Sequence, residues 1–584
     1  MKRKEWSEEE LNKELLRYFV EPYKENKEKY KQLKQRYKNG LRPEQVRYIS
    51  EMLKGNDVFA IMPTGAGKSM CFQLSGLLTP GVVVVISPLV ALIQDQTKAL
   101  KENGIPAVCI YNEYDEDEES DGDIFDLNLN ESFGWKRRKT AYFESAEGKV
   151  KFLYVTPERF RKAHFMVLLR HLQVNLLILD EVHCMSIWGH EFRHSYLEIL
   201  RVIKTLPNRP VIGAFTATAT KAVRDDVVKL LDLKLPENYF ENSGNTIIKE
   251  LIFEKHDLKA TVREVAWALR YYETENIANI TYSGEPESLK RFLAKKSRDY
   301  SAFYPNIDIV LNQLLNMPKE EWDEIKQANR NDFEWDHKKD EILSILDEYD
   351  GESGIVFCRT LANIHKVYSE LCNIYGKKTV VKYTGPMEKA EKNKSFHAFN
   401  TGSARIMVAT NAFGMGIDKQ NIHFVIHYNT PDSIENYYQE AGRAGRGYVD
   451  GNGKVRKHAH CHLLYSWVFD KIPYEFYTES LRFKGFRHLY DFTRQEEMRH
   501  YVKSKRKPEK FIDKYFNSAD FAHIWKEKIL NIYGCKENKF GEIKYVNKDK
   551  NHRNTIEKTR ETISEIMDSV YRLKIWSMWL LKKN

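Results

Sequence analysis

Residues 57–72 read DVFAIMPTGAGKSMCF, and this stretch decides the fold of the first half of the chain. A short apolar run predicts a buried β-strand, and the apolar segment that resumes after Lys68 predicts a helix. Gly65 and Gly67 let backbone N–H groups turn inward around a phosphate, at the positive end of that helix. The order of strand, glycine-rich loop and helix predicts a nucleotide-binding α/β domain, although the strict loop pattern has a glycine at the position of Met62.

The polar residues near this loop have separate expected roles. Lys68 would reach the β- and γ-phosphates of a nucleoside triphosphate, and the Ser69 hydroxyl would ligate Mg²⁺. In LLILDEVH, residues 176–183, an apolar strand delivers Asp180 and Glu181 at its carboxyl end, where ligands bind in open α/β sheets. Asp180 would hold Mg²⁺ and Glu181 would polarise the attacking water. The other loop residues expected to contact the nucleotide are Thr64, Gly65, Ala66 and Gly67.

Length and composition restrict the class of protein. A chain of 584 residues is too long for one hydrophobic core, so we expect several domains. The N-terminus, MKRKEWSEEEL, lacks an apolar signal region, and the longest apolar run, 81–93, is too short to span a bilayer. The 7 cysteines include no CxxC pair, which argues against a disulfide framework. We therefore expect a cytoplasmic protein without membrane contact, associated with the nucleoid if the source is bacterial.

Positive charge is concentrated near the C-terminus. Residues 471–584 contain 26 Lys and Arg against 16 Asp and Glu, an excess of 10, whereas the whole chain carries +9. Such asymmetry indicates a polyanionic partner such as nucleic acid. A solvated basic face without a partner is the alternative.

An aromatic and cationic stretch follows the carboxylates. SIWGHEFR, residues 186–193, combines rings that can stack on bases with cations that can contact phosphates. A buried structural role for the tryptophan is the alternative. The hydroxyls of FTATAT, 215–220, can bridge the nucleotide site and a partner site. The residues expected to bind DNA or to couple DNA to hydrolysis are Trp188, His190, Phe192, Arg193, Thr216 and Thr218.

The motifs occur in the order and spacing of a known family. LRPEQ, MPTGAGKS, SPLVALIQDQ, YVTPERF, LDEVHCMSIWGHEFR and FTATAT resemble the amino-terminal motor domain of RecQ-type superfamily 2 DNA helicases. GIVFCRT, VATNAFGMGIDK and YYQEAGRAGRG resemble motifs IV, V and VI of the same family. The resemblance covers about residues 36–235 and 337–467. It implies two RecA-like parallel-sheet domains in tandem and the cofactors ATP and Mg²⁺. It also implies 3′-to-5′ movement on single-stranded DNA and unwinding of tailed duplex DNA, in repair, recombination or genome defence.

The same resemblance implies further site residues. Arg42 and Gln45 resemble the family's adenine readers, and Tyr37 is a possible stacking partner for the base. Arg446 resembles the arginine that reaches the γ-phosphate from the second domain, where charge develops during phosphoryl transfer. The other residues expected on that face are Gln439, Arg443, Gly416 and Asp418.

The predicted organisation has five parts, with two accessory segments that the family pattern does not supply. Helical spacing predicts a helical insertion between the motor domains, and the C-terminal region reads as mainly helical, basic and aromatic. The expected parts are a helical arm at 1–38, a motor domain at 39–235 with an acidic insertion at about 111–148, the insertion at 256–336, a second motor domain at 337–467, and an accessory domain at 468–584.

Zinc binding is not expected. The family places a four-cysteine zinc subdomain after motif VI, but only Cys461 and Cys535 follow that motif here. His458, His460 and His462 lie near Cys461 in a strand-like segment whose side chains alternate between two faces, which is poor geometry for one metal ion.

Two other functions stay open at this stage. The first is a nucleic-acid-stimulated translocase or remodelling ATPase that does not unwind duplexes and that could act on RNA. The second is an ATP-switched scaffold subunit of a multi-protein defence or mobile-element system. In that case 256–336 or the C-terminal domain would dock a protein partner.

Overall fold

The structure is a computed structural model with two compact units. One comprises Met1–Ile248, Met415–Asp418 and Glu509–Asn584, and the other comprises Lys249–Gly414 and Lys419–Pro508. The residues that the structure describes are 5–63, 65–111, 149–186, 195–203, 206–237, 239–240, 251–258, 261, 263–264, 313, 317–318, 320–321, 324–325, 328–411, 413, 419, 421–444, 448–449, 455–456, 458–466, 469–470, 494, 497–498, 501–502, 504–505, 507–517, 535–537 and 543–545.

The first unit is built on a parallel sheet. Its strands are β1 (Val58–Ile61), β2 (Val82–Ile86), β3 (Ala107–Ile110), β4 (Phe152–Val155), β5 (Val174–Leu179) and β6 (Val211–Thr216). Its main helices are α1 (Glu8–Phe19), α2 (Lys27–Arg36), α3 (Pro43–Lys54), α4 (Lys68–Leu78), α5 (Val90–Glu102), α7 (Ala163–His171), α8 (Ser195–Ile203) and α9 (Lys221–Leu231). Three short 3₁₀ helices are η1 (Glu21–Tyr23), η2 (Pro157–Arg161) and η3 (Val182–Met185).

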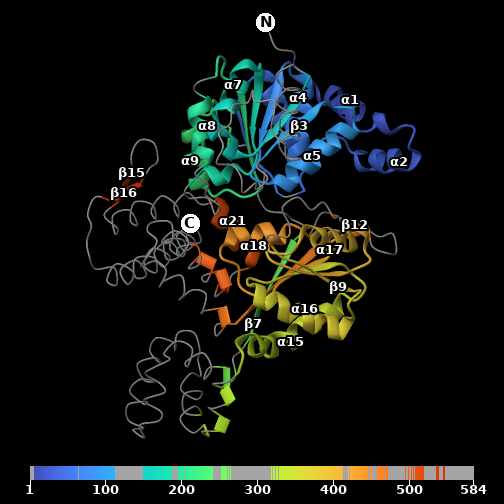
Figure 1. Ribbon diagram of the computed structural model, residues 1–584, viewed down its shortest axis with the longest axis vertical. Helices are drawn as coiled ribbons and strands as arrows, with labels where there is room; N and C mark the ends of the chain where they lie inside the picture. The colour runs from blue at the N-terminus through green and yellow to red at the C-terminus, as the bar shows by residue number, and fades with distance from the viewer. Residues whose placement is uncertain are drawn as a thin grey trace, which may run out of the picture. The chain divides into compact units, whose positions relative to one another are not determined.

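The strand order of this sheet is β1-β6-β5-β2-β4-β3, and every pair is parallel. Helices α4 and α5 cover one face, and α7 and α8 cover the other (Figure 1). Because both faces are covered, the central strand β2 is buried along its whole length. The carboxyl ends of β1, β2, β5 and β6 lie at the same edge, which brings the predicted site residues of the first unit together.

The N-terminal helix α1 packs against this unit. Ser7 and Glu10 form a capping box at its start, which satisfies two backbone N–H groups. Leu11 and Leu15 are fully buried. Asn12 Oδ1 accepts a hydrogen bond of 2.7 Å from the Leu41 backbone N–H, just before α3 begins. Helix α1 therefore helps to position the segment that leads to the phosphate loop.

The second unit contains another parallel sheet. Its strands are β7 (Leu251–Asp257), β8 (Gly354–Phe357), β9 (Val380–Tyr383), β10 (Ile406–Ala409), β11 (Phe424–His427) and β14 (Ala459–Tyr465). Its helices are α15 (Arg330–Glu348), α16 (Leu361–Tyr375), α17 (Lys389–Thr401) and α18 (Ile434–Ala441). Two short strands, β12 (Tyr448–Val449) and β13 (Val455–Arg456), also belong to this unit. The remaining elements, α21 (Pro508–Asn517) from Glu509 on, β15 (Cys535–Glu537) and β16 (Ile543–Tyr545), belong to the first unit.

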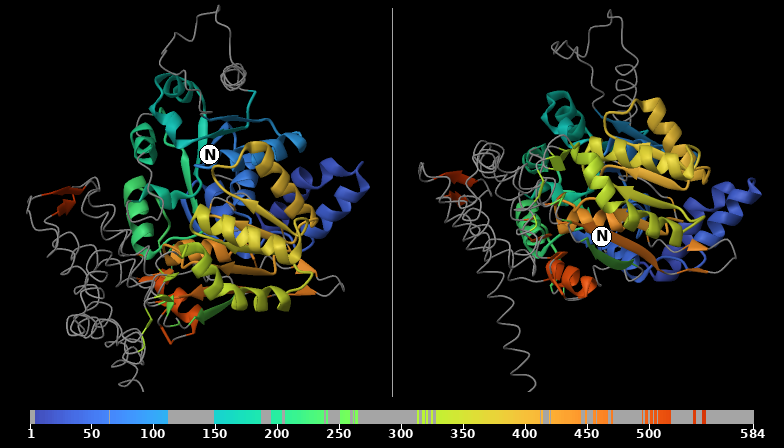
Figure 2. Two further views of the ribbon diagram at one scale, coloured as in Figure 1. Left: turned by 60° about the horizontal axis from the view of Figure 1, so that its bottom comes forward. Right: turned by 90° about the horizontal axis from the view of Figure 1, so that it is seen from below.

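The strand order of the second sheet is β7-β14-β11-β8-β10-β9, again all parallel. Helices α15 and α16 cover one face and α17 and α18 the other (Figure 1). Seen from below, α15 and α16 lie in front of the strands (Figure 2, right). The edge strand β7 ends at Asp257, just inside the predicted 256–336 insertion, and α15 begins at Arg330, before its predicted end. Residues from both ends of that segment therefore belong to the second unit. The predicted fold class, two parallel-sheet α/β domains in tandem, is confirmed.

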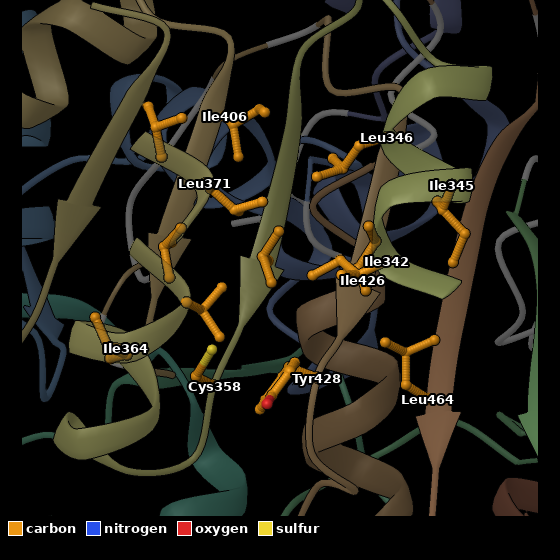
Figure 3. Close-up of a cluster of buried hydrophobic side chains, with 14 of the residues drawn as sticks. Ile342, Ile345, Leu346, Cys358, Ile364, Leu371, Ile406, Ile426, Tyr428 and Leu464 are labelled. Atoms are coloured by element: carbon orange, nitrogen blue, oxygen red, sulfur yellow. The ribbon is translucent and has the colours of Figure 1, made fainter. Parts of the chain in front are cut away.

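The core of the second unit lies between this sheet and the helices α15 and α16 (Figure 3). Each fully buried aliphatic side chain stabilises such a core by about 1.5–3 kcal/mol. The residues labelled in the figure are Ile342, Ile345, Leu346, Cys358, Ile364, Leu371, Ile406, Ile426, Tyr428 and Leu464.

Beside this core lies a buried ionic cluster. The fully buried Lys338 Nζ on α15 lies 3.0 Å from Glu334 Oε1 and 3.5 Å from Asp470 Oδ2. It also donates a hydrogen bond to the Tyr428 carbonyl. Burial opposes its charge, but the attraction of Asp470 and Glu334 outweighs burial and raises the pKa of Lys338. The lysine is therefore charged at neutral pH and links α15 to the segment that follows β14.

No helix among the described residues has the length and apolar content that crossing a membrane requires. The acidic insertion, most of the 256–336 insertion and most of 468–584 lie outside the described residues. The predictions about those segments stay predictions.

Candidate active site

The phosphate loop joins β1 to α4. Met62 N donates a hydrogen bond of 2.9 Å to the Thr216 carbonyl, so the residue that replaces a motif glycine extends the pairing of β1 with β6. Gly65 and Gly67 have φ values of 79° and 84°, which favour glycine. Helix α4 then begins at Lys68. The loop therefore has the backbone conformation and the helix N-terminus that the sequence predicted.

Gln45 fixes the loop from α3. Its Nε2 donates hydrogen bonds of 3.3 Å to the Ala66 carbonyl and 3.2 Å to the Gly67 carbonyl. Its Oε1 accepts a hydrogen bond of 2.9 Å from Arg42 N at the start of the helix. A Cβ atom on Gly67 would lie 2.4 Å from Gln45 Nε2, so any side chain at this position would displace the Gln45 amide from the loop. Tyr37 is half-buried at the end of α2.

Asp180 lies at the carboxyl end of β5 and is buried. Burial, followed by the nearby charge of Glu181, raises the pKa of Asp180 to about 6. Its Oδ2 lies 3.5 Å from the Ser87 hydroxyl, and its Oδ1 is buried without a hydrogen-bond partner among the described residues. A buried carboxylate oxygen without a partner fits a divalent cation.

Glu181 adopts the left-handed backbone conformation, with φ 48°. A glutamate in this region costs about 1–3 kcal/mol, and such strain clusters at functional sites. Its Oε1 lies 3.2 Å from Lys68 Nζ and its Oε2 lies 3.3 Å from His183 Nδ1. Burial opposes ionisation, but the charges of Lys68 and His183 outweigh it and lower the pKa of Glu181. The strained turn thus aims an ionised carboxylate at the phosphate loop.

His183 extends this group of charges toward β6. Its Nδ1 lies 2.8 Å from the Thr216 hydroxyl, whose oxygen accepts a hydrogen bond of 3.3 Å from Thr218 N. Burial opposes protonation of His183, but Cys184 and Glu181 outweigh it and raise its pKa to about 10. Lys68, Glu181, His183, Thr216 and Thr218 therefore form one continuous polar network. The sequence motifs assign no role to His183, although its position in LDEVH was an available signal.

Ser69 has a partner that the sequence motifs do not indicate. Gln96 Nε2, from α5, donates a hydrogen bond of 3.0 Å to Ser69 Oγ. The serine lies in the first turn of α4, next to Lys68. Its hydroxyl and the Asp180 carboxylate are oxygen ligands of the kind that Mg²⁺ prefers. The first unit therefore supplies residues that fit a magnesium-bound triphosphate.

The predicted motif VI residues lie in the second unit. Gln439 is half-buried on α18, and Arg443 is buried just after that helix. The other predicted residues lie outside the described residues, and they are Thr64, Trp188, His190, Phe192, Arg193, Gly416, Asp418 and Arg446.

The second unit also has a polar pocket at the carboxyl ends of β8 and β11. Its lining includes Arg359, Asn411, His427, Asn429 and Glu440. His427 Nε2 lies 2.9 Å from Glu440 Oε2, and the Asn429 side chain accepts a hydrogen bond of 3.1 Å from Arg359 N. This is the sheet edge at which ligands bind in open α/β folds.

Comparisons with known proteins agree with both units. The DEAD/DEAH box helicase family matches residues 42–226, and the helicase conserved C-terminal domain matches residues 337–448. ATP-dependent DNA helicase RecQ of Bacillus subtilis is 32% identical over 406 residues, which are 69% of this chain and 51% of that protein. The chain is a divergent RecQ-type member of helicase superfamily 2. The family that the motifs indicated is thereby confirmed.

Other relatives of this RecQ-type chain differ in their named substrates. ATP-dependent DNA helicase Q-like 4B of Arabidopsis thaliana is 31% identical over 439 residues, 74% of this chain and 29% of that protein. Putative ATP-dependent RNA helicase R290 of Acanthamoeba polyphaga mimivirus is 28% identical over 467 residues, 77% of this chain and 64% of that protein. The chain spans about half the length of its Bacillus subtilis relative.

Proposed function

We propose that this RecQ-type chain couples ATP hydrolysis to 3′-to-5′ movement along single-stranded DNA and unwinds duplex DNA. The observation that carries the proposal is the polar network of the first unit. It links Lys68 and Glu181 at the phosphate loop to Thr216 and Thr218 at the end of β6 through His183. Thr216 and Thr218 are buried, so they would relay a change at the phosphates toward the proposed nucleic-acid contacts.

The hydrolytic roles follow from charge and position. Lys68 would neutralise the β- and γ-phosphates, and Ser69 and Asp180 would hold Mg²⁺. When Lys68 moves to the phosphates, Glu181 loses a cationic partner 3.2 Å away, and its carboxylate becomes available to orient the attacking water. Magnesium would supply charge neutralisation at the transferred phosphoryl group.

Residues outside the phosphate loop would recognise the adenine base and complete the ATP site. Arg42 and Gln45 would read the adenine edge, with Tyr37 stacking on the ring. Gln45 Nε2 donates its two hydrogens to carbonyls of the phosphate loop, so reading the base would exchange one of these bonds for a contact with adenine. Arg446 would stabilise charge on the γ-phosphate. The remaining residues of that face would be Arg443, Gln439, Gly416 and Asp418.

The aromatic stretch at 186–193 is the proposed DNA sensor. Its first residue, Ser186, donates a hydrogen bond of 2.6 Å to Asp226 on α9. This bond anchors the beginning of the stretch three residues after His183. Stacking of bases on aromatic rings is worth about 1–3 kcal/mol per base and tolerates any sequence. The stacking and phosphate contacts would come from Trp188, His190, Phe192 and Arg193.

The proposed substrates are single-stranded and tailed duplex DNA, and the proposed setting is repair, recombination or genome defence in the cytoplasm, with the nucleoid in a bacterium. A protein partner would bind through 256–336 or the C-terminal region. The relatives' names support DNA as the substrate, since several are DNA helicases.

Unwinding of tailed duplexes tests this function. The purified chain, with ATP and Mg²⁺, is expected to separate a fluorescent duplex with a 3′ single-stranded tail and to leave blunt and 5′-tailed duplexes intact. Preference for the 5′ tail would overturn the polarity. Strong DNA-stimulated hydrolysis without strand separation on any duplex would instead favour the second candidate function.

That second candidate is a translocase or remodelling ATPase without unwinding. It is favoured by the cysteine content, since only Cys461 and Cys535 follow motif VI in this sequence, too few for the family's four-cysteine site. Cys461 is buried in the second sheet, where its Sγ lies 3.9 Å from the Ala441 carbonyl. Displacement of a protein block from single-stranded DNA would identify this activity, and the same assay on RNA would test the alternative substrate.

Replacing His183 by alanine is expected to lower the ratio of DNA-stimulated to basal ATP hydrolysis about tenfold. The substitution removes the link between Glu181 and Thr216, and coupling energies between sites are roughly 1–3 kcal/mol. The ratio is measured by steady-state ATPase assays with and without saturating single-stranded DNA.

The matched control is His171→Ala, since His171 is an exposed histidine of α7 in the same unit. It should keep the wild-type ratio. An unchanged ratio in the His183 variant would remove this histidine from the coupling path.

A further inference from the structure

A group of histidines and glutamates lies on the second sheet, where β7 pairs with β14. In this parallel register His462 lies opposite Glu254, and Leu464 lies opposite His256. Side chains two positions apart share one face of a strand, so Glu254 and His256 project on the same side as His460 and His462. Cys461, between the two histidines, points to the other face. The site residues on β7 are about 200 positions away in sequence, which is why the histidine segment alone suggested poor metal geometry.

The ligand atoms of three of these residues converge. His256 Nε2 lies 3.0 Å from His462 Nδ1, and Glu254 Oε2 lies 3.9 Å from the same nitrogen. One ligand atom from each residue falls within a 4.8 Å cluster. In a tetrahedral zinc site with Zn–N bonds of about 2.0–2.1 Å, neighbouring ligand atoms lie about 3.3 Å apart. The observed separations are close to this value, so small side-chain movements would complete the site.

Two further residues orient the ligands. Glu341 on α15 lies 2.5 Å from His256 Nδ1, which directs Nε2 of that ring into the cluster. His460 Nδ1 lies 2.6 Å from Glu254 Oε1, which leaves Oε2 on the side of His462. Carboxylates that hold the second nitrogen of a ligating histidine are typical of protein metal sites. The cluster therefore has an inner set of ligands and an outer set that fixes their orientation.

The three ligand side chains differ in their exposure to solvent. The His462 side chain is 2% exposed, whereas the side chains of Glu254 and His256 are 40% and 19% exposed. An ion can thus reach the ligands from solvent while the site stays anchored in the sheet. The Tyr349 ring, after α15, lies 5.8 Å from the His462 ring and covers that side of the cluster.

We propose that Glu254, His256 and His462 bind one divalent transition-metal ion, with Zn²⁺ as the ion that best fits two imidazoles and a carboxylate. This site is separate from the ATP site and from any four-cysteine zinc subdomain. Its ligands come from β7, which overlaps the start of the 256–336 segment, and from β14. Its orienting Glu341 comes from α15, which overlaps the end of that segment. The bound ion would fasten the edge strand and join the two ends of the insertion.

Metal titration tests the proposal without reference to ATPase activity. The full chain is stripped with a chelator and titrated with Co²⁺, whose visible bands are intense in tetrahedral sites, and with Zn²⁺ in a calorimeter. We expect one ion per chain, a tetrahedral Co²⁺ spectrum that Zn²⁺ abolishes, and a higher melting temperature with Zn²⁺. A wild-type chain that binds no Zn²⁺ at this stoichiometry would show that the cluster is only a hydrogen-bonded network.

Variants locate the site. His256→Ala and Glu254→Gln should each weaken Zn²⁺ binding about 100-fold or more, and Glu341→Gln about 10-fold to 100-fold. The matched control is His397→Ala, an exposed histidine on α17, which packs at β9, the opposite edge of the same sheet. Circular dichroism of each variant, recorded after the chelator has removed bound metal, identifies any variant that fails to fold. Wild-type affinity in a folded His256→Ala protein would overturn the assignment.

Discussion

The Glu181→Gln protein is expected to hydrolyse ATP about 10²–10⁴-fold more slowly than the wild type and to bind ATP about equally well. An amide has nearly the same shape as the carboxylate and can still accept a hydrogen bond from Lys68, but it cannot accept a proton from water at neutral pH. General-base catalysis typically contributes a factor of this size. The rate is measured as steady-state phosphate release with saturating single-stranded DNA, and affinity with a fluorescent ATP analogue.

A carboxylate elsewhere in the first unit provides the control. Asp225 is an exposed residue of α9 that pairs with Arg224, and Asp225→Asn should keep the wild-type rate. If Glu181→Gln hydrolysed ATP within about threefold of the wild type, another group would have to orient the water. If the substitution abolished ATP binding, its effect would be structural and the catalytic role would be unsupported.

The Lys338→Ala protein is expected to lose about 3–5 kcal/mol of unfolding free energy in the second unit. Removing one partner of a buried ion pair leaves an uncompensated charge, which costs this much. Here Glu334 would keep hydrogen bonds of 2.6 Å from Asn429 and 3.0 Å from Asn363, but neither donor carries a positive charge. Asp470 would also lose its lysine. The measurement is chemical denaturation of the full chain at neutral pH, monitored by far-ultraviolet circular dichroism.

The adjacent lysine on the same helix is the matched control. Lys339 and its partner Asp336 have side chains that are 43% and 68% exposed, and exposed pairs contribute about 0–1 kcal/mol. Lys339→Ala should therefore unfold almost as the wild type does. Equal stability of the two variants would contradict the structural role of the buried cluster.

Much of the first unit could be predicted from local patterns. The strand and helix around Gly65 and Gly67 appear where the apolar runs placed them, and Asp180 and Glu181 lie at a strand end as expected. These features depend on short-range spacing, so the sequence carries them directly. The pKa values of the two carboxyl groups shift in opposite directions: that of Asp180 is raised and that of Glu181 is lowered. These shifts could not be predicted from the sequence, because they depend on burial and on neighbours that only the fold brings together.

Contacts between distant segments could not be predicted in the same way. His183 meets Thr216 across 33 positions, and Lys338 meets Asp470 across 132. Glu334 lies four residues before Lys338 on the same helix, a spacing that local sequence can indicate. Lysine is seldom buried, however, and nothing near Lys338 in the sequence indicates its burial or its contact with Asp470. The pairing of β7 with β14 likewise depends on sheet order, because the strands are separated by most of the second unit. The proposed metal cluster cannot be predicted without knowing that β7 pairs with β14 in this register.

The most direct test of the central claim is steady-state ATP hydrolysis by the purified chain, alone and with single-stranded DNA, duplex DNA or RNA, with Lys68→Ala as the blank. The network from Lys68 and Glu181 to Thr216 predicts a large rise with single-stranded DNA that disappears in the Lys68 variant. If ATP still bound but no nucleic acid raised the rate, the result would contradict a DNA-driven motor and favour an ATP switch controlled by a protein partner.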